Sequence, residues 1–225
     1  MSRRTGRPSY LLASPARQQR STTRMGAGAA AAALALGLVG GLIGFAVGQP
    51  SPTEAGIAQM REANAKRDVQ QIIGLTEMAR RTADQLSPIL VAIKQDSDAG
   101  RTPEASQVHQ WQQTMRQLTE QFDDPPSGTT ATNVARGGLR SAVDQGAVAV
   151  DSVALAVTSP TPVRKNQLTL AARQAALASV TWSIAAAQLD QINIDAGRGH
   201  QHVYLDAGDA EGAFTADGAA EGSDG

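Results

Sequence analysis

The residues best suited to chemistry are two histidines near the C-terminal end. His200 and His202 occur in the run Gly-Arg-Gly-His-Gln-His, and an extended chain directs side chains two residues apart to the same side. With a carboxylate from Asp195, Asp206 or Asp209, two imidazoles form a ligand set that transition metals accept. A glycine-rich segment supports metal ligands poorly. We therefore treat His200 and His202 as weak candidates and predict no metal site and no cofactor.

Other polar residues give no stronger indication of catalysis. Asp144 and Asp151 are seven residues apart and share one helix face, where paired acids can exchange protons. Neither a histidine nor a nucleophile lies near them in the sequence, so we interpret them as a solvated surface. His109 borders an apolar stripe and is interpreted as a boundary residue. The glycine-rich phosphate loops and the serine-hydrolase and zinc-protease signatures do not occur. We expect a protein without catalytic residues.

Composition limits the fold and the partners. Among the 225 residues are no cysteines, which excludes disulfides, thiolate metal sites and thiol catalysis. Aromatic residues make up only 3%, so a core must consist of Ala, Val, Leu and Ile, which suits closely packed helices. The formal net charge of −1 gives no sign of nucleic-acid binding.

The N-terminal region predicts a membrane anchor. Residues 1–24 carry six arginines and no acid, and residues 25–48 carry no charge. As a helix, residues 25–48 would span about 36 Å, enough to cross a bilayer and contact its lipid. Arginines on one flank predict a cytoplasmic N-terminus and an extracytoplasmic C-terminal part in a single-pass topology. A cleaved export signal is the alternative, because Ala46 and Gly48 provide small residues before a cut.

Glycines form a pattern inside this apolar segment. Gly40, Gly44 and Gly48 recur at every fourth residue, which makes a flat strip where a second helix can approach. This spacing predicts a homo-oligomer through the membrane helix. The alternative is that glycine is simply frequent in this segment.

The remaining chain reads as a helical bundle. Prolines divide it into four helical segments, at about 53–96, 103–122, 131–158 and 162–196. Apolar residues at alternating spacings of three and four predict that these helices form an antiparallel four-helix bundle over 53–196, with a kink near Pro88. The leading candidates for its core are Val69, Ile72, Leu86, Leu90, Ile93, Trp111, Leu118, Trp182 and Leu189.

Both ends of the chain read as disordered. The basic arm 1–24 and the acidic, Gly/Ala/Asp-rich tail 197–225 offer little apolar surface to offset chain entropy. The predicted fold is therefore all-α: a transmembrane helix followed by a helical bundle between disordered termini.

These patterns favour a non-catalytic structural or protein-interaction module. Abundant arginine, alanine and glycine suggest a bacterial source and place the expected bundle in the cell envelope, where it would contact itself or an unidentified envelope protein. The alternative is a ligand- or metal-binding, sensor-like module, secreted if the N-terminal segment is cleaved.

Overall fold

A computed structural model describes residues 52–123, 126, 128–206, 213–216 and 218–223 of the chain. It confirms the all-helical prediction, with four helices and no strand among these residues. Of the described helices, none combines the length and the hydropathy needed to cross a bilayer. The predictions for the arm 1–24, the apolar segment 25–48 and its glycine strip fall outside the described residues.

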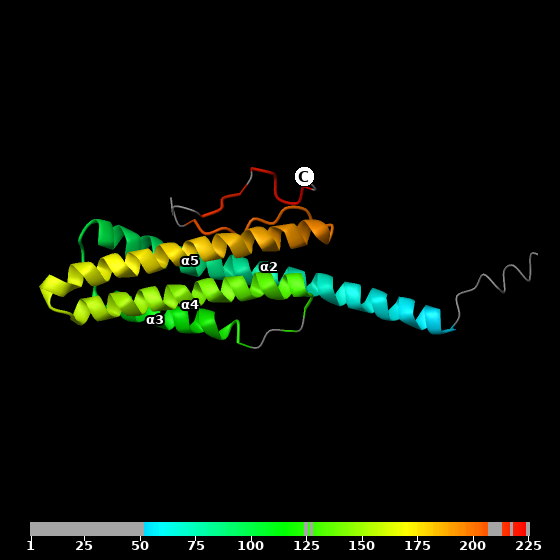
Figure 1. Ribbon diagram of the computed structural model, residues 1–225, viewed down its shortest axis with the longest axis horizontal. Coiled ribbons are helices and arrows are strands. Elements are labelled where there is room, and N and C mark those ends of the chain that lie inside the picture. The colour runs from blue at the N-terminus through cyan, green and yellow to red at the C-terminus, as the bar shows by residue number, and fades with distance from the viewer. Residues whose placement is uncertain (1–51, 124–125, 127, 207–212, 217, 224–225) are drawn as a thin grey trace, which may run out of the picture. The chain divides into compact units, whose positions relative to one another are not determined.

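The helices begin and end close to the proline-marked boundaries (Figure 1). They are α2 (Pro52–Asp98), α3 (Ala105–Glu120), α4 (Thr130–Thr158) and α5 (Thr161–Asp195). Pro162 lies in the first turn of α5, where its missing N–H costs no helical hydrogen bond. Pro88 lies inside α2, and the helix continues on both sides of it.

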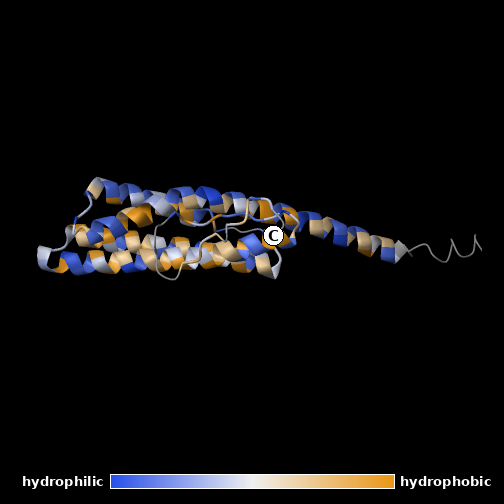
Figure 2. Cartoon of the chain, turned by 90° about the horizontal axis from the view of Figure 1, so that it is seen from above, coloured by the Kyte–Doolittle hydropathy of each residue, from blue (hydrophilic) through white to orange (hydrophobic). Residues whose placement is uncertain are grey.

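The bundle belongs to the unit formed by residues 60–225. Hydrophobic and hydrophilic residues alternate along its helices, as expected where each helix buries one side (Figure 2).

Alanine controls how α4 and α5 pack. Small side chains recur at seven-residue steps on both helices, so the backbones can approach closely. At Gly138 a β-carbon would lie 2.8 Å from the β-carbon of Ala185, which leaves no room for a side chain. The buried alanines in this series are Ala135, Ala142, Ala149 and Ala156 of α4 and Ala171, Ala178 and Ala185 of α5.

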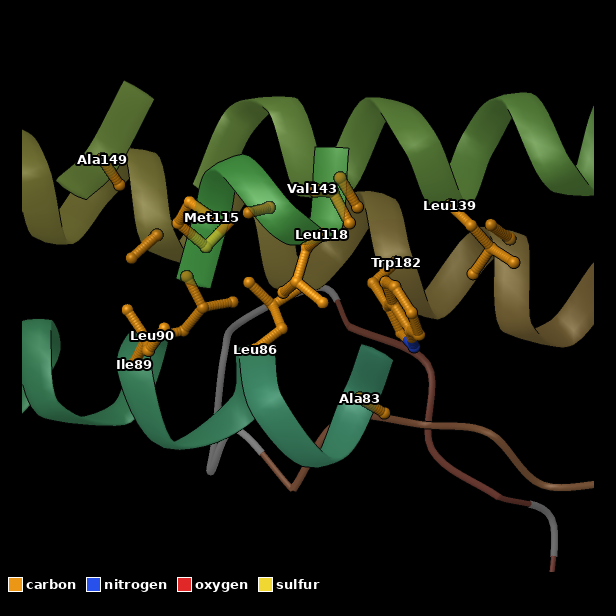
Figure 3. Close-up of a cluster of buried hydrophobic side chains, with 14 of the residues drawn as sticks. Ala83, Leu86, Ile89, Leu90, Met115, Leu118, Leu139, Val143, Ala149 and Trp182 are labelled. Carbon is orange, nitrogen blue, oxygen red and sulfur yellow. The ribbon is translucent and has the colours of Figure 1, made fainter. Parts of the chain in front are cut away.

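Larger side chains fill the space between α2, α3 and α4 (Figure 3). A β-carbon on Gly146 would lie 3.0 Å from Leu86 Cδ1 and 3.2 Å from Met115 Cε, so three helices meet at this glycine. Of the core candidates, Val69 is only half-buried, because it borders the stretch 60–67 of α2, where every residue is exposed. The buried candidates are Ile72, Leu86, Leu90, Ile93, Trp111, Leu118, Trp182 and Leu189.

The chain after α5 differs from the disorder expected of it. Residues 199–206, called here the C-terminal strap, are ordered against the bundle. Val203 is 2% exposed, and its carbonyl oxygen accepts a hydrogen bond from Trp182 Nε1 at 2.7 Å. Gly199 has a φ of 65° and packs on the backbone of Gly222, so the turn into the strap needs a residue without a β-carbon. A few buried side chains and hydrogen bonds thus fix a segment of low overall hydropathy.

Candidate functional site

One side of the α4–α5 pair exposes apolar side chains in regular order. Val148 and Leu155 of α4 are 51% and 59% exposed, and Leu177 of α5 is 61% exposed. The spacing of seven places the residues of each helix in one line along its surface. The exposed apolar residues, called here the α4–α5 face, are Val134, Val148 and Leu155 of α4 and Val163, Leu170, Leu177 and Ile184 of α5.

A shallow groove lined by both polar and apolar side chains runs between the two apolar lines. Thr181 Oγ1 of α5 donates a hydrogen bond to Gln145 Oε1 of α4 at 3.1 Å. Ser141, Val148 and Leu177 line the same groove. The two helices are therefore joined along this side, and their apolar lines form one continuous surface.

The two edges of the α4–α5 face carry opposite charges. On the α4 edge, Asp151 accepts a hydrogen bond from Gln112 of α3 at 2.9 Å, which shows that this edge borders α3. Asp144 lies one helical turn before Val148 and also lines the groove between α4 and α5. On α5, Arg173 lies between Leu170 and Leu177 and is exposed. The α4 edge therefore carries the Asp151 carboxylate, and the α5 edge carries the Arg173 guanidinium.

The structure does not assemble a catalytic group from the other candidates. The Asp144 carboxylate lies 3.9 Å from Arg140 Nε on its own helix, while Asp151 bonds to α3. His109 is exposed and its Nε2 lies 3.0 Å from Gln113 Nε2, also on its own helix. These residues therefore remain separate surface groups.

A different group of titratable residues comes together where the C-terminal strap packs on α5. His200 Nδ1 lies 2.9 Å from Asp190 Oδ2, and both residues are buried, at 7% and 8% exposure. The ring centroids of His200 and His202 are 5.6 Å apart. One ligand atom from each of Asp190, His200 and His202 lies within 4.8 Å of the others. We call these three residues the His–Asp cluster.

Hydrogen bonds from several segments hold this cluster in place. The backbone N–H of Gln201 donates to Asp190 Oδ1, so both carboxylate oxygens have a hydrogen-bond partner. The backbone N–H of His202 donates to Glu221 Oε1 at 2.8 Å, and Glu221 Oε2 pairs with Arg80 of α2 at 2.7 Å. The strap is thereby connected to both α5 and α2.

The carboxylate in the cluster is not one that the sequence suggested. Asp195 accepts a hydrogen bond from Gln191 on its own helix, Asp206 is exposed, and Asp209 lies outside the described residues. Asp190 is a buried acid that follows the buried Leu189 in α5. An acid next to a core residue was the feature of the sequence that could have pointed to Asp190 as a ligand. Only the return of the chain over α5 brings the histidines to it.

The comparisons with known proteins do not assign this site. No family model, no curated protein and no solved structure matches the chain. The geometry of the described residues must therefore carry the functional argument.

Proposed function

We propose that this chain is a non-catalytic, membrane-anchored interaction module of the bacterial cell envelope, with its helical bundle outside the cytoplasm. Its partner at the α4–α5 face is a second copy of the chain. The observation that carries this proposal is the pair of exposed apolar lines on adjacent helices. Contiguous apolar surface of this kind is typical of protein contacts.

The heptad spacing supports a helical partner. Leu170, Leu177 and Ile184 are separated by seven residues, as are Val148 and Leu155. A seven-residue apolar repeat fits the side-by-side packing of helices in a coiled coil or bundle. Two such helix pairs, face to face, would form a four-helix interface that buries both apolar lines.

The charges at the edges favour a second copy over an unrelated helix pair. With a two-fold axis parallel to the helices, α4 of each copy lies beside α5 of the other. The close approach of Gly138 to Ala185 and the bond between Gln145 and Thr181 put Arg173 level with Asp151, so Asp151 of one copy then meets Arg173 of the other. Each copy supplies both edges, so the surface is complementary to itself.

The N-terminal sequence supports the anchoring part of the proposal. Residues 25–48 carry no charge, and the arginines stand on one flank only. A two-fold axis parallel to the helices keeps equivalent ends of two copies together, as two anchors in one membrane require. The proposed orientation and the proposed dimer are therefore compatible.

Cross-linking of the full chain in membranes tests the interface. The chain has no cysteine, so Leu177→Cys introduces a single thiol into the α4–α5 face. We expect a short bismaleimide to join two Leu177→Cys chains. Met60→Cys, at a side chain that is 62% exposed but outside the face, is the matched control and should remain uncross-linked. Equal cross-linking of both variants, or none at Leu177, would contradict the proposal.

Charge reversal identifies the partner. Arg173→Asp and Asp151→Arg should each weaken cross-linking of the Leu177→Cys chain to itself. Mixing the two charge variants in one membrane should restore it, because each then meets an opposite charge. Failure of the mixture to recover, or capture of an envelope protein in place of a second copy, would overturn the assignment of the partner.

A further inference from the structure

We propose that Asp190, His200 and His202 bind a divalent transition-metal ion and that this ion fastens the C-terminal strap to α5. The proposal goes beyond the interaction function, because the His–Asp cluster and the α4–α5 face use different residues. Asp190 belongs to α5, and the two histidines belong to the C-terminal strap, which turns after α5 and packs back on it.

The separations within the cluster suit a metal after small movements. In a tetrahedral zinc site with bonds of about 2.0–2.1 Å, neighbouring ligand atoms lie roughly 3.4 Å apart. The Asp190–His200 contact of 2.9 Å is slightly shorter than this, and the widest separation in the cluster is no more than 4.8 Å. His202 lies outside regular secondary structure and is only half-buried, so rotation of its ring can close the difference.

The hydrogen bond between His200 and Asp190 marks the position that the metal ion would take. His200 Nδ1 and Asp190 Oδ2 face each other at 2.9 Å and share one hydrogen bond. A metal ion needs a lone pair on each ligand atom, so binding between Nδ1 and the carboxylate displaces the hydrogen of this bond to Nε2 or to solvent. The metal then takes the place of the proton between His200 and Asp190.

The donor set selects the class of ion. Two imidazole nitrogens and one carboxylate oxygen suit zinc, nickel, copper or cobalt, whereas magnesium and calcium prefer oxygen ligands throughout. Three protein ligands leave one tetrahedral position for water.

The surroundings of the cluster supply the support that a loose glycine-rich segment would lack. Asp190 Oδ1 is oriented by the Gln201 N–H, and the backbone of His202 is held by Glu221. His200 is also fixed through its backbone, whose N–H donates to the Ser223 carbonyl at 2.9 Å and whose carbonyl accepts from the Gly222 N–H at 2.8 Å. Ligands held in this way lose less entropy when an ion binds.

Metal titration of the stripped full chain tests the proposal. We expect calorimetry with Zn²⁺ to find one ion per chain, and we expect Co²⁺ to give the visible absorption of a tetrahedral nitrogen and oxygen site. Binding should weaken as pH falls through the range where histidine protonates. Zn²⁺ should also slow trypsin cleavage after Arg198, because the ion holds the adjoining strap on α5.

His202→Gln separates metal binding from folding, because the hydrogen bond between His200 and Asp190 remains in that variant. We expect it to lower Zn²⁺ affinity at least tenfold and to abolish the protection at Arg198. His109→Gln, at an exposed histidine of α3, is the matched control and should bind as the parent does. An absence of binding in the parent, or equal binding by the parent and His202→Gln, overturns the proposal.

Discussion

The indole nitrogen of Trp182 donates a 2.7 Å hydrogen bond to the carbonyl oxygen of Val203, which joins the centre of α5 to the C-terminal strap. Trp182 is fully buried, and Val203 is 2% exposed. One side chain therefore fills the core and also satisfies a buried backbone group in the segment that covers it.

Trp182→Phe should loosen the strap. Phenylalanine retains much of the apolar volume but leaves the Val203 carbonyl without its donor, at a cost of about 1–3 kcal/mol. We expect faster trypsin cleavage after Arg198 and faster amide exchange in residues 199–206. Trp111→Phe is the control, because Trp111 belongs to α3 and takes no part in this hydrogen bond. Equal acceleration of cleavage in the two variants would show that the contact does not hold the strap.

Leu86→Ala should destabilise the whole bundle. Leu86 is fully buried where α2 meets α3 and α4, so the shorter side chain leaves a cavity beside Gly146. A loss of about 2–5 kcal/mol in the free energy of unfolding is expected for such a truncation. Urea denaturation followed by circular dichroism measures it. Met60→Ala, at an exposed site on the same helix, should change this free energy by less than about 0.5 kcal/mol.

Two adjacent glycines of α4 should respond differently to alanine. A β-carbon on Gly137 meets nothing within 4 Å, so Gly137→Ala should stabilise the helix by about 0.5–1 kcal/mol. A β-carbon on Gly138 would lie 2.8 Å from Ala185, so Gly138→Ala must separate α4 from α5 at an overpacking cost of about 1–3 kcal/mol. Thermal unfolding of the two variants compares them directly. A higher melting temperature for Gly138→Ala than for Gly137→Ala would contradict the close packing.

Gly44→Leu tests self-association through the predicted membrane helix. If Gly40, Gly44 and Gly48 form a contact surface, leucine at Gly44 should separate the helices and weaken the dimer. On a helix that faces lipid, the same change should leave association unaltered. A two-hybrid reporter carrying residues 25–48 measures the difference, with Leu42→Ala as the control off the strip. Unchanged association of Gly44→Leu would show that the glycine spacing has no role in self-association.

The helices themselves could be predicted from the sequence because the information is local and periodic. Leu86, Leu90 and Ile93 repeat at helical spacing, and Pro162 marks the start of a helix. Leu170 and Leu177 of α5 repeat at helical spacing too, and the structure leaves them exposed. Periodicity cannot tell a buried line from an exposed one, since both have the same spacing, so tertiary packing decided between them.

The C-terminal strap and its cluster depended on tertiary structure. Residues 197–206 show no repeat, and their order rests on contacts with Trp182 and Asp190 of α5 and Arg80 of α2, which the folded bundle brings together. The sequence by itself determined that His200 and His202 are two residues apart in a run that contains two glycines. The fold decided that Asp190, ten residues before His200, is the carboxylate beside them, because the chain turns at Gly197 and Gly199 and runs back over α5. Such a contact depends on the path of the chain, which spacing alone does not encode.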